Sequence, residues 1–380
     1  MIYLDEAATT PLRRDVLAAM GPYLGPAFGN PSSHHEVGES ARRGLEQARA
    51  DAAAALGARP GEIIFTSGGT EGANTAVKGI ALAAPRGRHV VVSAVEHPAV
   101  LESARWLGRL GFDVTELGVD EHGLVRPSDL AAALRDDTTL VSVQHASNEV
   151  GTVQPVAELA AVAAERGVPF HTDAVQSAAW PDLDAGIDVT RLGVQALSLS
   201  AHKIGGPKGV GLLWVRRGPR VEPLVHGGGQ QDGRRSGTED VAGAVGLAAA
   251  LRLAATAEPS AAEVAGRRGR FVAAVLAGVP GAALTGHPTR RLPGHASFVL
   301  PGRSGESVLL DLERRGVVCS SGSACHAGSD EPSHVLVAMG LAAEVAQTAV
   351  RFTFGRSTTD DQLAEAARAL VEVCAGTRTR

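Results

Sequence analysis

The sequence predicts an α/β protein that has a large domain built on a mainly parallel sheet and a smaller α+β domain. Between about residues 60 and 215, short β-branched runs alternate with alanine-rich stretches of helical spacing, the pattern of βα units. From about residue 259 onward, strand-like and helical segments are mixed. The chain has 380 residues, of which 44% are hydrophobic, so it can bury more than one core.

The elements follow in order along the chain. Composition predicts strands in the first region over residues 62–66, 89–93, 139–145, 168–172, 195–200 and 211–215. Helical spacing predicts helices over 99–110 and 155–166, and an alanine-rich helix over about 241–256 leads into the second region. That region contains predicted strands over 296–300 and 350–354. The first 15 residues could pack with either domain.

Charge and composition exclude several classes of protein. The net charge is −5, aromatic residues make up only 3%, and no basic run is interleaved with aromatics, so we expect no direct nucleic-acid partner. The N-terminus lacks the pattern of a signal peptide, and no apolar run approaches the roughly 20 residues of a membrane helix. Cys319, Cys325 and Cys374 have neither metal-ligand spacing nor an even number. We therefore expect no metal site, no membrane and a cytoplasmic location.

Lysine is rare in this chain, with three lysines against 33 arginines. An amine can lose its proton and attack a carbonyl, whereas a guanidinium stays charged, so a retained lysine is a candidate for a covalent Schiff base. Composition alone favours coding bias as the explanation, so the neighbours of each lysine must decide. Lys203 follows a predicted strand, whereas Lys208 lies in a glycine-flanked turn and Lys78 lies within a helix.

Two other segments place polar groups where predicted strands end. Residues 65–74, FTSGGTEGAN, include Gly69 and Thr70, and their small side chains would let backbone N–H groups surround an anion at a helix N-terminus. A plain strand-to-helix turn capped by Thr70 explains this segment equally well. Asp173 ends another strand, at the edge where open α/β sheets bind ligands. Its alternative role is that of a helix cap.

Taken with Lys203, these groups form a set. An anion cradle, a carboxylate and a reactive amine would share one sheet edge, together with Ser200 and His202. Pyridoxal 5′-phosphate requires these parts, because a carboxylate such as Asp173 keeps the ring nitrogen protonated and makes the ring an electron sink. The sequence therefore predicts a pyridoxal-phosphate site whose covalent residue is Lys203.

Ten segments of the chain resemble, in the same order, those of the cysteine desulfurases of the NifS and IscS type, within class V of the pyridoxal-phosphate-dependent aminotransferases. The segments are YLDEAATT from Tyr3, GNPSSHHEVG from Gly29, FTSGGTEGAN from Phe65, EHPAV from Glu96, SNEVGTVQP from Ser147, HTDAVQ from His171, SLSAHKIGGPKGVG from Ser198, HGGGQQDGRRSGT from His226, SSGSACHAGS from Ser320 and RFTFGR from Arg351.

The resemblance runs almost end to end and implies fold type I of the pyridoxal-phosphate enzymes. In that fold, the large domain would comprise residues 16–257 and carry a mainly parallel, seven-stranded sheet. The small domain would comprise residues 1–15 and 258–380 and carry the catalytic cysteine loop.

Roles for individual residues also follow from the resemblance. Around the cofactor ring, His97 would stack and move protons, and Gln176 would hydrogen-bond the ring hydroxyl. The phosphate would be held by the Gly69 amide, Thr70, Ser200 and His202. Thr238 would reach the phosphate of a neighbouring subunit, which implies a homodimer.

For the substrate, the resemblance implies that Arg351 takes the carboxylate of L-cysteine, since a planar guanidinium matches a carboxylate bidentately. Asn148 would add a hydrogen bond to the same group.

Cys325 decides which reaction is expected. It lies in a stretch of small residues ahead of a predicted helix over 332–339, unlike Cys319, which has apolar neighbours. By resemblance, the Cys325 thiolate attacks the substrate sulfur, and L-alanine and a persulfide on Cys325 result. His326 beside it could favour the thiolate. The sulfur would pass to an acceptor protein by thiol exchange, for which iron–sulfur cluster assembly is the most frequent destination in the family.

Three rival functions remain open: a selenocysteine lyase or other β-lyase, a phosphoserine-type aminotransferase, and a sulfur-relay scaffold that keeps the cofactor only for structure. Alanine release from cysteine compared with selenocysteine, activity with 2-oxoglutarate, and persulfide formation separate them. Several positions also depart from the commonest family pattern, namely Glu6, Gly69, Gly72, Gln144, Ser147, His326 and Ala327.

Overall fold

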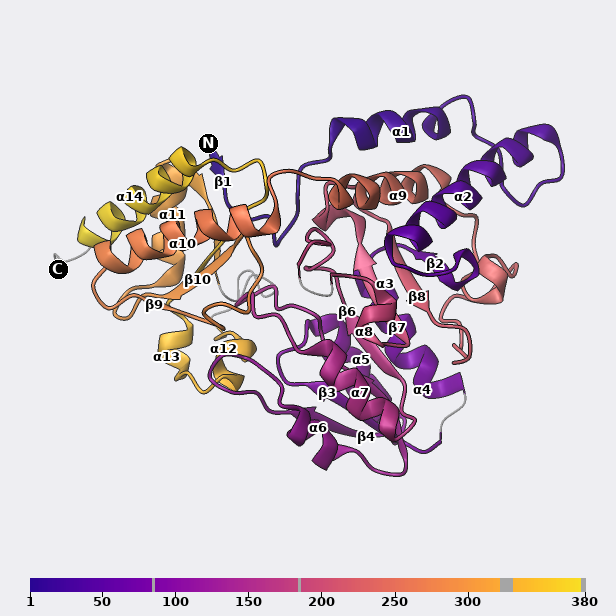
Figure 1. Ribbon diagram of the computed structural model, residues 1–380, viewed down its shortest axis with the longest axis horizontal. Helices are drawn as coiled ribbons and strands as arrows, with labels where there is room; N and C mark the ends of the chain where they lie inside the picture. Colours follow the sequence, from indigo (N-terminus) through magenta and orange to yellow (C-terminus); the bar gives the residue numbers. More distant parts are fainter. Residues whose placement is uncertain (84–85, 184–185, 322–330, 377–380) are drawn as a thin grey trace.

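The computed structural model describes residues 1–83, 86–183, 186–321 and 331–376. The chain forms two lobes, and Figure 1 shows the N-terminal strand and the last helix both in the smaller one. A seven-stranded sheet forms the centre of the large lobe, and a four-stranded sheet forms the centre of the small lobe.

The large sheet is mainly parallel. Its strands, in spatial order, are β2 (Ile63–Thr66), β8 (Gly211–Val215), β7 (Ala196–Ser200), β6 (Phe170–Asp173), β5 (Thr138–Ser142), β3 (His89–Ser93) and β4 (Asp113–Leu117). The pairs from β7 to β4 are parallel, while β8 runs antiparallel to both of its neighbours. The predicted fold class, with its seven strands, is therefore confirmed.

Helices cover both faces of this sheet, as parallel sheets require. Along β3, Val91 belongs to one core cluster and Val90 and Val92 to another, because successive side chains of a strand point to opposite faces. The helices of the large lobe are α1 (Arg14–Leu24), α2 (Glu36–Ala55), α3 (Gly69–Asn74), α4 (Ile80–Ala83), α5 (Pro98–Arg109), α6 (Pro127–Ala133), α7 (Val156–Glu165), α8 (Val189–Leu192) and α9 (Val241–Ala255). A π-helical turn, Thr75–Gly79, joins α3 to α4.

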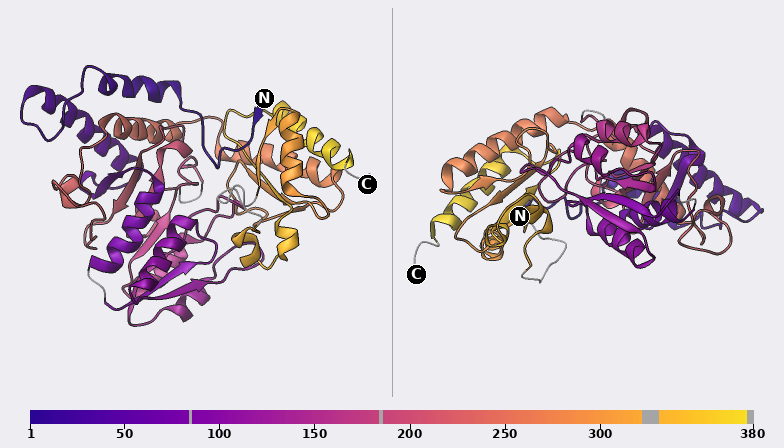
Figure 2. Two further views of the ribbon diagram at one scale, coloured as in Figure 1. Left: turned by 180° about the vertical axis from the view of Figure 1, so that it is seen from behind. Right: turned by 90° about the horizontal axis from the view of Figure 1, so that it is seen from below.

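The small sheet has the order β12 (Ser320–Ser321), β13 (Ala349–Thr353), β10 (His295–Val299) and β9 (Ala283–Leu284). The main helices beside it are α10 (Ala261–Gly278), α11 (Gly305–Arg314) and α14 (Asp360–Gly376), and two short ones are α12 (His334–Ala338) and α13 (Ala343–Ala346). Figure 2, seen from below, shows α10 and α14 along the outer side of this lobe. Phe271 packs edge-on against Phe298, Phe352 and Phe354 in its core.

The first residues join the small lobe. β1 (Ile2–Tyr3) pairs in parallel with β11 (Val317–Val318), and Asp5 bridges Thr353 of β13. From Thr10 the chain crosses to the large lobe, where α1 packs on α9. The division of the chain at residues 15 and 257 stays a prediction.

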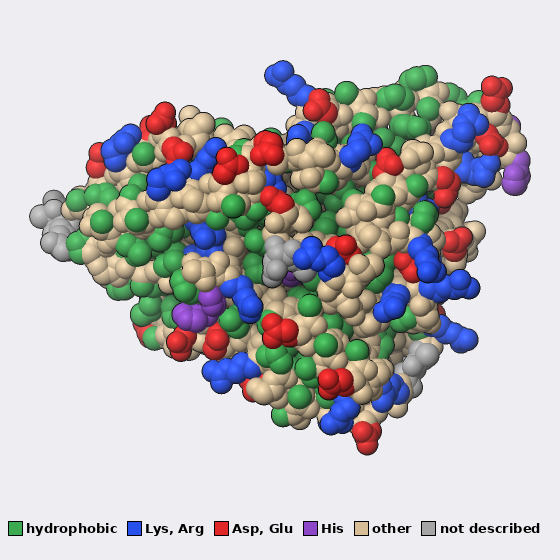
Figure 3. All heavy atoms as spheres, viewed as in Figure 1, with side chains coloured by type: hydrophobic (Ala, Val, Ile, Leu, Met, Phe, Trp, Pro, Cys, Tyr) green, Lys and Arg blue, Asp and Glu red, His purple; other side chains and the backbone are tan. Residues whose placement is uncertain are grey.

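The strands expected from the sequence are present with ends shifted by up to three residues. β4 was not predicted, because this edge strand carries charged residues and four of its five side chains are exposed or half-buried, so it lacks a continuous apolar run. Helix α12 begins two residues later than expected, after Ser333, whose hydroxyl caps it. On the face shown in Figure 3, charged side chains of both signs are interspersed. None of the helices in the described part of the chain has the length and hydrophobicity needed to span a bilayer.

Candidate active site

Ten of the twelve predicted site residues line one cavity at the carboxyl ends of strands β5, β6 and β7. This sheet-edge cavity has a volume of about 280 Å³, close to the lower end of the roughly 300–1,000 Å³ of small-ligand sites. The ten residues are Gly69, Thr70, His97, Asn148, Asp173, Gln176, Ser200, His202, Lys203 and Arg351. The strand order thus brings together residues that are up to 282 positions apart in the sequence.

The other two residues are not placed in this cavity. Thr238 is exposed and does not line it. Cys325 lies outside the described residues, as do its neighbours His326 and Ala327. The described cysteines are Cys319 and Cys374, and burial raises the pKa of each thiol above its ordinary value. Over the described ranges, no group of three or more His, Cys, Asp or Glu side chains could hold a metal ion.

Lys203 lies one short turn beyond β7, at the end of the 3-10 helix Ala201–Lys203. Its Nζ donates hydrogen bonds to the carbonyl oxygens of Ala7 and Ala8, the second at 2.7 Å. Gln176 also donates to the Ala7 carbonyl, at 3.1 Å. The N-terminal segment therefore holds the amine in place, a contact across nearly 200 residues that sequence analysis missed.

Asp173 ends β6 and is 7% exposed. Its Oδ1 accepts a hydrogen bond from the Val175 amide at 2.9 Å, and no helix begins directly after it, so the helix-cap alternative is wrong. Burial raises the pKa of its carboxyl to about 6, against the opposing effect of the Lys203 charge. A buried acid with this pKa is well placed to bind a protonated ring nitrogen, because such a partner would stabilise its ionised form.

His97 precedes α5, and its Nδ1 accepts a hydrogen bond from the Ala99 amide at 3.1 Å. This bond fixes the ring orientation, since Nδ1 serves as the acceptor. Burial, together with the positive charges of Lys203 and His334, lowers the pKa of His97 to about 4. The imidazole is therefore neutral near pH 7, which suits a ring that stacks on an aromatic ligand.

The anion cradle is formed by the start of α3. Gly68 is the N-cap of this helix and provides no side-chain cap, so Thr70 is not the cap; the anion cradle itself stays a prediction. A Cβ at Gly69 would lie 2.6 Å from Cγ2 of Val175 and 3.5 Å from Cβ of Ser200. Glycine is thus required where the chain passes closest to the cavity wall. First-turn N–H groups and the Thr70 and Ser200 hydroxyls fit a phosphate there.

His202 adds a further polar group to this side of the cavity. Its Nδ1 lies 3.1 Å from Oγ1 of Thr9, and its carbonyl accepts hydrogen bonds from Thr10. Burial and the Lys203 charge lower the pKa of His202 to about 4. The cradle, the acid and the amine together fit the phosphate, the ring nitrogen and the aldehyde of pyridoxal phosphate.

Arg351 lies on β13 of the small lobe and is 1% exposed. Its Nη2 pairs with Oδ1 of Asp5 at 2.8 Å, and its Nη1 donates to the Asn148 carbonyl at 3.0 Å. Among the described residues, Asp5 is the one carboxylate that pairs with Arg351, so this buried cation at the cavity wall can also accept the carboxylate of a substrate, in a bidentate pair. Sequence analysis missed Asp5 as its partner, although the YLDEAATT segment contains it.

Gln144 also lines the cavity, although it departs from the common family pattern. Its backbone amide donates to Oε1 of Glu96 at 2.5 Å, and its side-chain amide donates to the Val95 carbonyl. Glu96 is completely buried, which raises the pKa of its carboxyl well above the usual range. Gln144 thus links the segment that follows β5 to Glu96, which directly precedes His97.

Comparison with known proteins assigns the chain to a family. The aminotransferase class-V family matches residues 2–365. The chain belongs to this family. It is also 46% identical, over 364 residues, to a cysteine desulfurase IscS from Dictyoglomus turgidum, an alignment that covers 95% of this chain and 91% of that protein. The resemblance to NifS and IscS proteins is therefore confirmed.

Solved structures agree with this assignment. A NifS-like protein superposes with a TM-score of 0.91 at 34% identity, covering 99% of each chain. A second structure, described as SspA in complex with cysteine, superposes with a TM-score of 0.82 at 35% identity, covering 94% of this class-V chain and all of the other.

Proposed function

We propose that this protein is a cysteine desulfurase, which removes sulfur from L-cysteine, releases L-alanine and leaves a persulfide on Cys325. The observation that carries the proposal is the meeting of Lys203, Asp173, His97 and Arg351 in one cavity. The 46% identity to a cysteine desulfurase IscS over nearly the whole chain supports the same activity.

Pyridoxal phosphate, when bound, supplies an electron sink for the bond changes at the substrate. Lys203 would hold its aldehyde, and the Nζ amine would afterwards take the substrate Cα proton. The Ala7 and Ala8 carbonyls orient this amine through their hydrogen bonds with Nζ. Asp173 would keep the ring nitrogen protonated, Gln176 would contact the ring hydroxyl, and neutral His97 would stack on the ring.

Arg351 would bind the substrate carboxylate, with Asn148 adjacent to it. Because Arg351 is buried and already oriented by Asp5, little conformational entropy is lost when the carboxylate arrives. This contact would fix the direction in which the substrate thiol points. The Cys325 thiolate would then attack that sulfur, and the new S–S bond would form as the substrate C–S bond breaks.

The deciding experiment compares Cys325→Ala with Cys374→Ala in the purified, cofactor-loaded protein. Cys374 is the matched control, because it is a thiol buried in the small-lobe core. We expect Cys325→Ala to keep the cofactor absorption and to form no persulfide with L-cysteine, and Cys374→Ala to form persulfide normally. Mass spectrometry of the intact chain reads the added sulfur. Persulfide on Cys319 or Cys374 in the Cys325→Ala protein would contradict the assignment.

Lys203 is tested by Lys203→Ala. The wild-type protein should be yellow, and the variant should lose both this absorption and alanine release. Retained turnover would refute the role of Lys203.

The same proposal includes a homodimer in which Thr238 reaches the partner's phosphate site, a cytoplasmic location and a sulfur-acceptor protein. The exposed position of Thr238 supports such a contact between subunits. Iron–sulfur cluster assembly is the proposed destination of the sulfur. Transfer of labelled sulfur from the persulfide to captured partner proteins tests this destination.

A further inference from the structure

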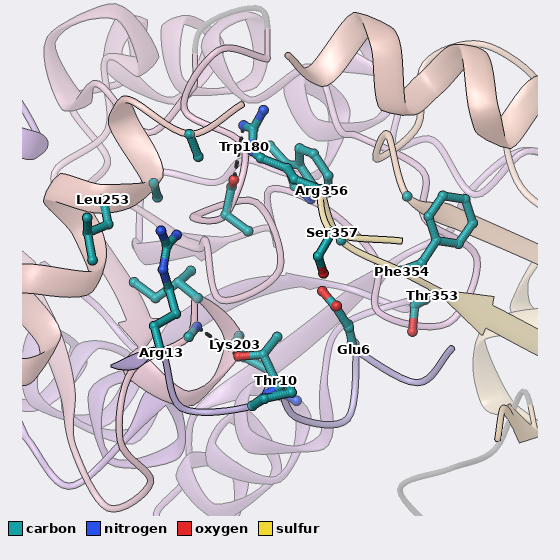
Figure 4. A pocket seen from close by; sticks show the side chains of 18 of the residues that line it. Glu6, Thr10, Arg13, Trp180, Lys203, Leu253, Thr353, Phe354, Arg356 and Ser357 are labelled. Carbon is teal, nitrogen blue, oxygen red and sulfur yellow. Dashed lines mark hydrogen bonds between the residues drawn. The ribbon is translucent and has the colours of Figure 1, made fainter. Parts of the chain in front are cut away.

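A second, larger cavity lies where the two lobes meet. This domain-junction cavity has a volume of about 810 Å³ and shares Ala7, Gln176 and Lys203 with the sheet-edge cavity. The N-terminal segment from Ala7 to Thr10 therefore separates the two cavities. Figure 4 shows the side chains that line the domain-junction cavity, which come from both lobes.

One wall of the domain-junction cavity is acidic. Glu6 follows the bridge between Asp5 and β13, and its carboxylate accepts a hydrogen bond from the Gly355 backbone. A Cβ at Gly355 would overlap this carboxylate, so the glycine makes the approach possible. Figure 4 shows the Glu6 carboxylate directed toward Ser357 at the cavity wall.

The facing wall is cationic. The aliphatic part of Arg13 packs on Gly205, where a Cβ would lie 2.6 Å from Cγ of Arg13 and where φ is +78°. Arg13 forms no ion pair with any residue in the described ranges, and its guanidinium projects into the cavity in Figure 4. Arg356 differs, because it pairs with Asp182 at 2.7 Å and stacks over Trp180. Arg13 is thus a cation that a ligand in this cavity could pair with.

Between these walls, Trp180, Leu253, Leu292 and Phe354 contribute apolar surface to the lining. We propose that the domain-junction cavity binds a free α-amino acid with an apolar side chain, its carboxylate on Arg13 and its ammonium on Glu6. A zwitterion satisfies both walls at once, whereas a simple anion or cation satisfies only one. This site does not depend on the proposed desulfurase activity.

The Glu6 carboxyl should release a proton when the proposed ligand binds. Burial raises the pKa of its carboxyl to about 7, and the Gly355 hydrogen bond opposes this only in part. An ammonium beside it would favour the ionised form and lower that pKa, so binding near pH 7 releases protons. The charged or titratable groups that line the same cavity are Arg13, Arg14, Lys203, Glu258, His295 and Arg356.

The ligand would also contact the segment that holds Lys203. Ala7 lines both cavities, and its carbonyl accepts hydrogen bonds from Lys203 and Gln176.

Isothermal titration calorimetry of the cofactor-loaded protein with L-leucine tests the site. We expect saturable binding that Arg13→Ala and Glu6→Gln each weaken by at least about tenfold, while Arg109→Ala, an exposed arginine at the end of α5, leaves it unchanged. Titration in buffers of different ionisation enthalpy should report proton release near pH 7 in the wild type and none in Glu6→Gln.

Visible absorption of the cofactor, recorded during the same titration, separates the two cavities. It should stay constant, because L-leucine occupies the domain-junction cavity. The proposal is overturned by any of three results: no saturable heat, equal affinity in the wild type and both variants, or an absorption change that follows the binding heat. Thermal melting of each variant checks that it is folded.

Discussion

Replacing Arg351 by lysine keeps the positive charge at the proposed carboxylate site but removes the bidentate geometry of the guanidinium. Arg351 is 1% exposed and uses two nitrogens, Nη2 toward Asp5 at 2.8 Å and Nη1 toward the Asn148 carbonyl at 3.0 Å. Lysine keeps the positive charge, which prevents an unpaired Asp5, but its single ammonium cannot form a bidentate pair with a substrate carboxylate. Arg351→Lys should therefore fold and bind cofactor, yet bind L-cysteine poorly.

The size of the effect follows from the hydrogen bond that is lost. One charge-assisted hydrogen bond contributes about 1.5–3 kcal/mol, which corresponds to roughly 10- to 150-fold in kcat/KM. Most of this loss should appear as a higher KM, because the carboxylate is held in both the ground state and the transition state. Alanine release measured over a range of L-cysteine concentrations gives both parameters.

Arg252→Lys is the matched control, since Arg252 is an exposed arginine of α9 that pairs with Asp51 at 3.2 Å. It should leave KM and kcat unchanged. The reasoning is refuted if Arg351→Lys changes KM by less than about threefold while its melting temperature and cofactor absorption match the wild type.

Three other outcomes are expected. In the cofactor-free protein, the pKa of Asp173 is raised from 3.8 to about 6. As pH rises through that range, the free energy of unfolding of the wild type should therefore fall by about 3 kcal/mol relative to that of Asp173→Asn, which urea denaturation of both proteins measures. Gly69→Val should melt several degrees below the wild type and fail to develop the cofactor absorption, because its side chain would collide with Val175. Phe298→Ala, in the small-lobe core, should lose about 3–5 kcal/mol of stability in the same denaturation assay, and a loss below about 1 kcal/mol would contradict the packing described.

The sign for Asp173 follows from proton binding. Between pH 4 and 6 the folded state, with its raised pKa, holds the proton that the unfolded state has released. Folding is therefore favoured on the acidic side and loses this advantage as pH rises through about 6. A stability that rose over this range in the wild type and fell in Asp173→Asn would contradict the burial of the carboxyl.

The sequence predicted the strand ends of the large lobe to within three residues, because fully buried strands are continuous apolar runs. β3 and β8 have the expected bounds, and Asp173 and Ser200 end their strands as expected. Since the carboxyl ends of parallel strands meet at one edge, the convergence of Asp173, Ser200 and Lys203 could be inferred without coordinates. β4 could not be predicted in this way, because four of its five residues are exposed or half-buried and they form no apolar run.

Contacts between the lobes were not predictable from local pattern. The Arg351–Asp5 pair joins residues 346 positions apart, and the hydrogen bond from Lys203 to Ala8 spans 195. Nothing in the composition of residues 5–8 indicates that the Ala7 and Ala8 carbonyls contact a lysine of the large lobe. Nor does it indicate that the Asp5 carboxylate contacts an arginine of the small lobe. Periodicity reports which face of an element is buried, not which distant segment covers it.

The N-terminal segment explains why a departure at Glu6 is compatible with an intact active site. Asp5 directs its carboxylate to Arg351 in the sheet-edge cavity, while the next residue, Glu6, lines only the domain-junction cavity. A substitution at position 6 thus changes the charge of the second cavity. It leaves in place the hydrogen bonds of Arg351 to Asp5 and Asn148 and those of Lys203 to Ala7 and Ala8. The segment consequently allows the domain-junction cavity to vary its ligand independently of the chemistry at Lys203.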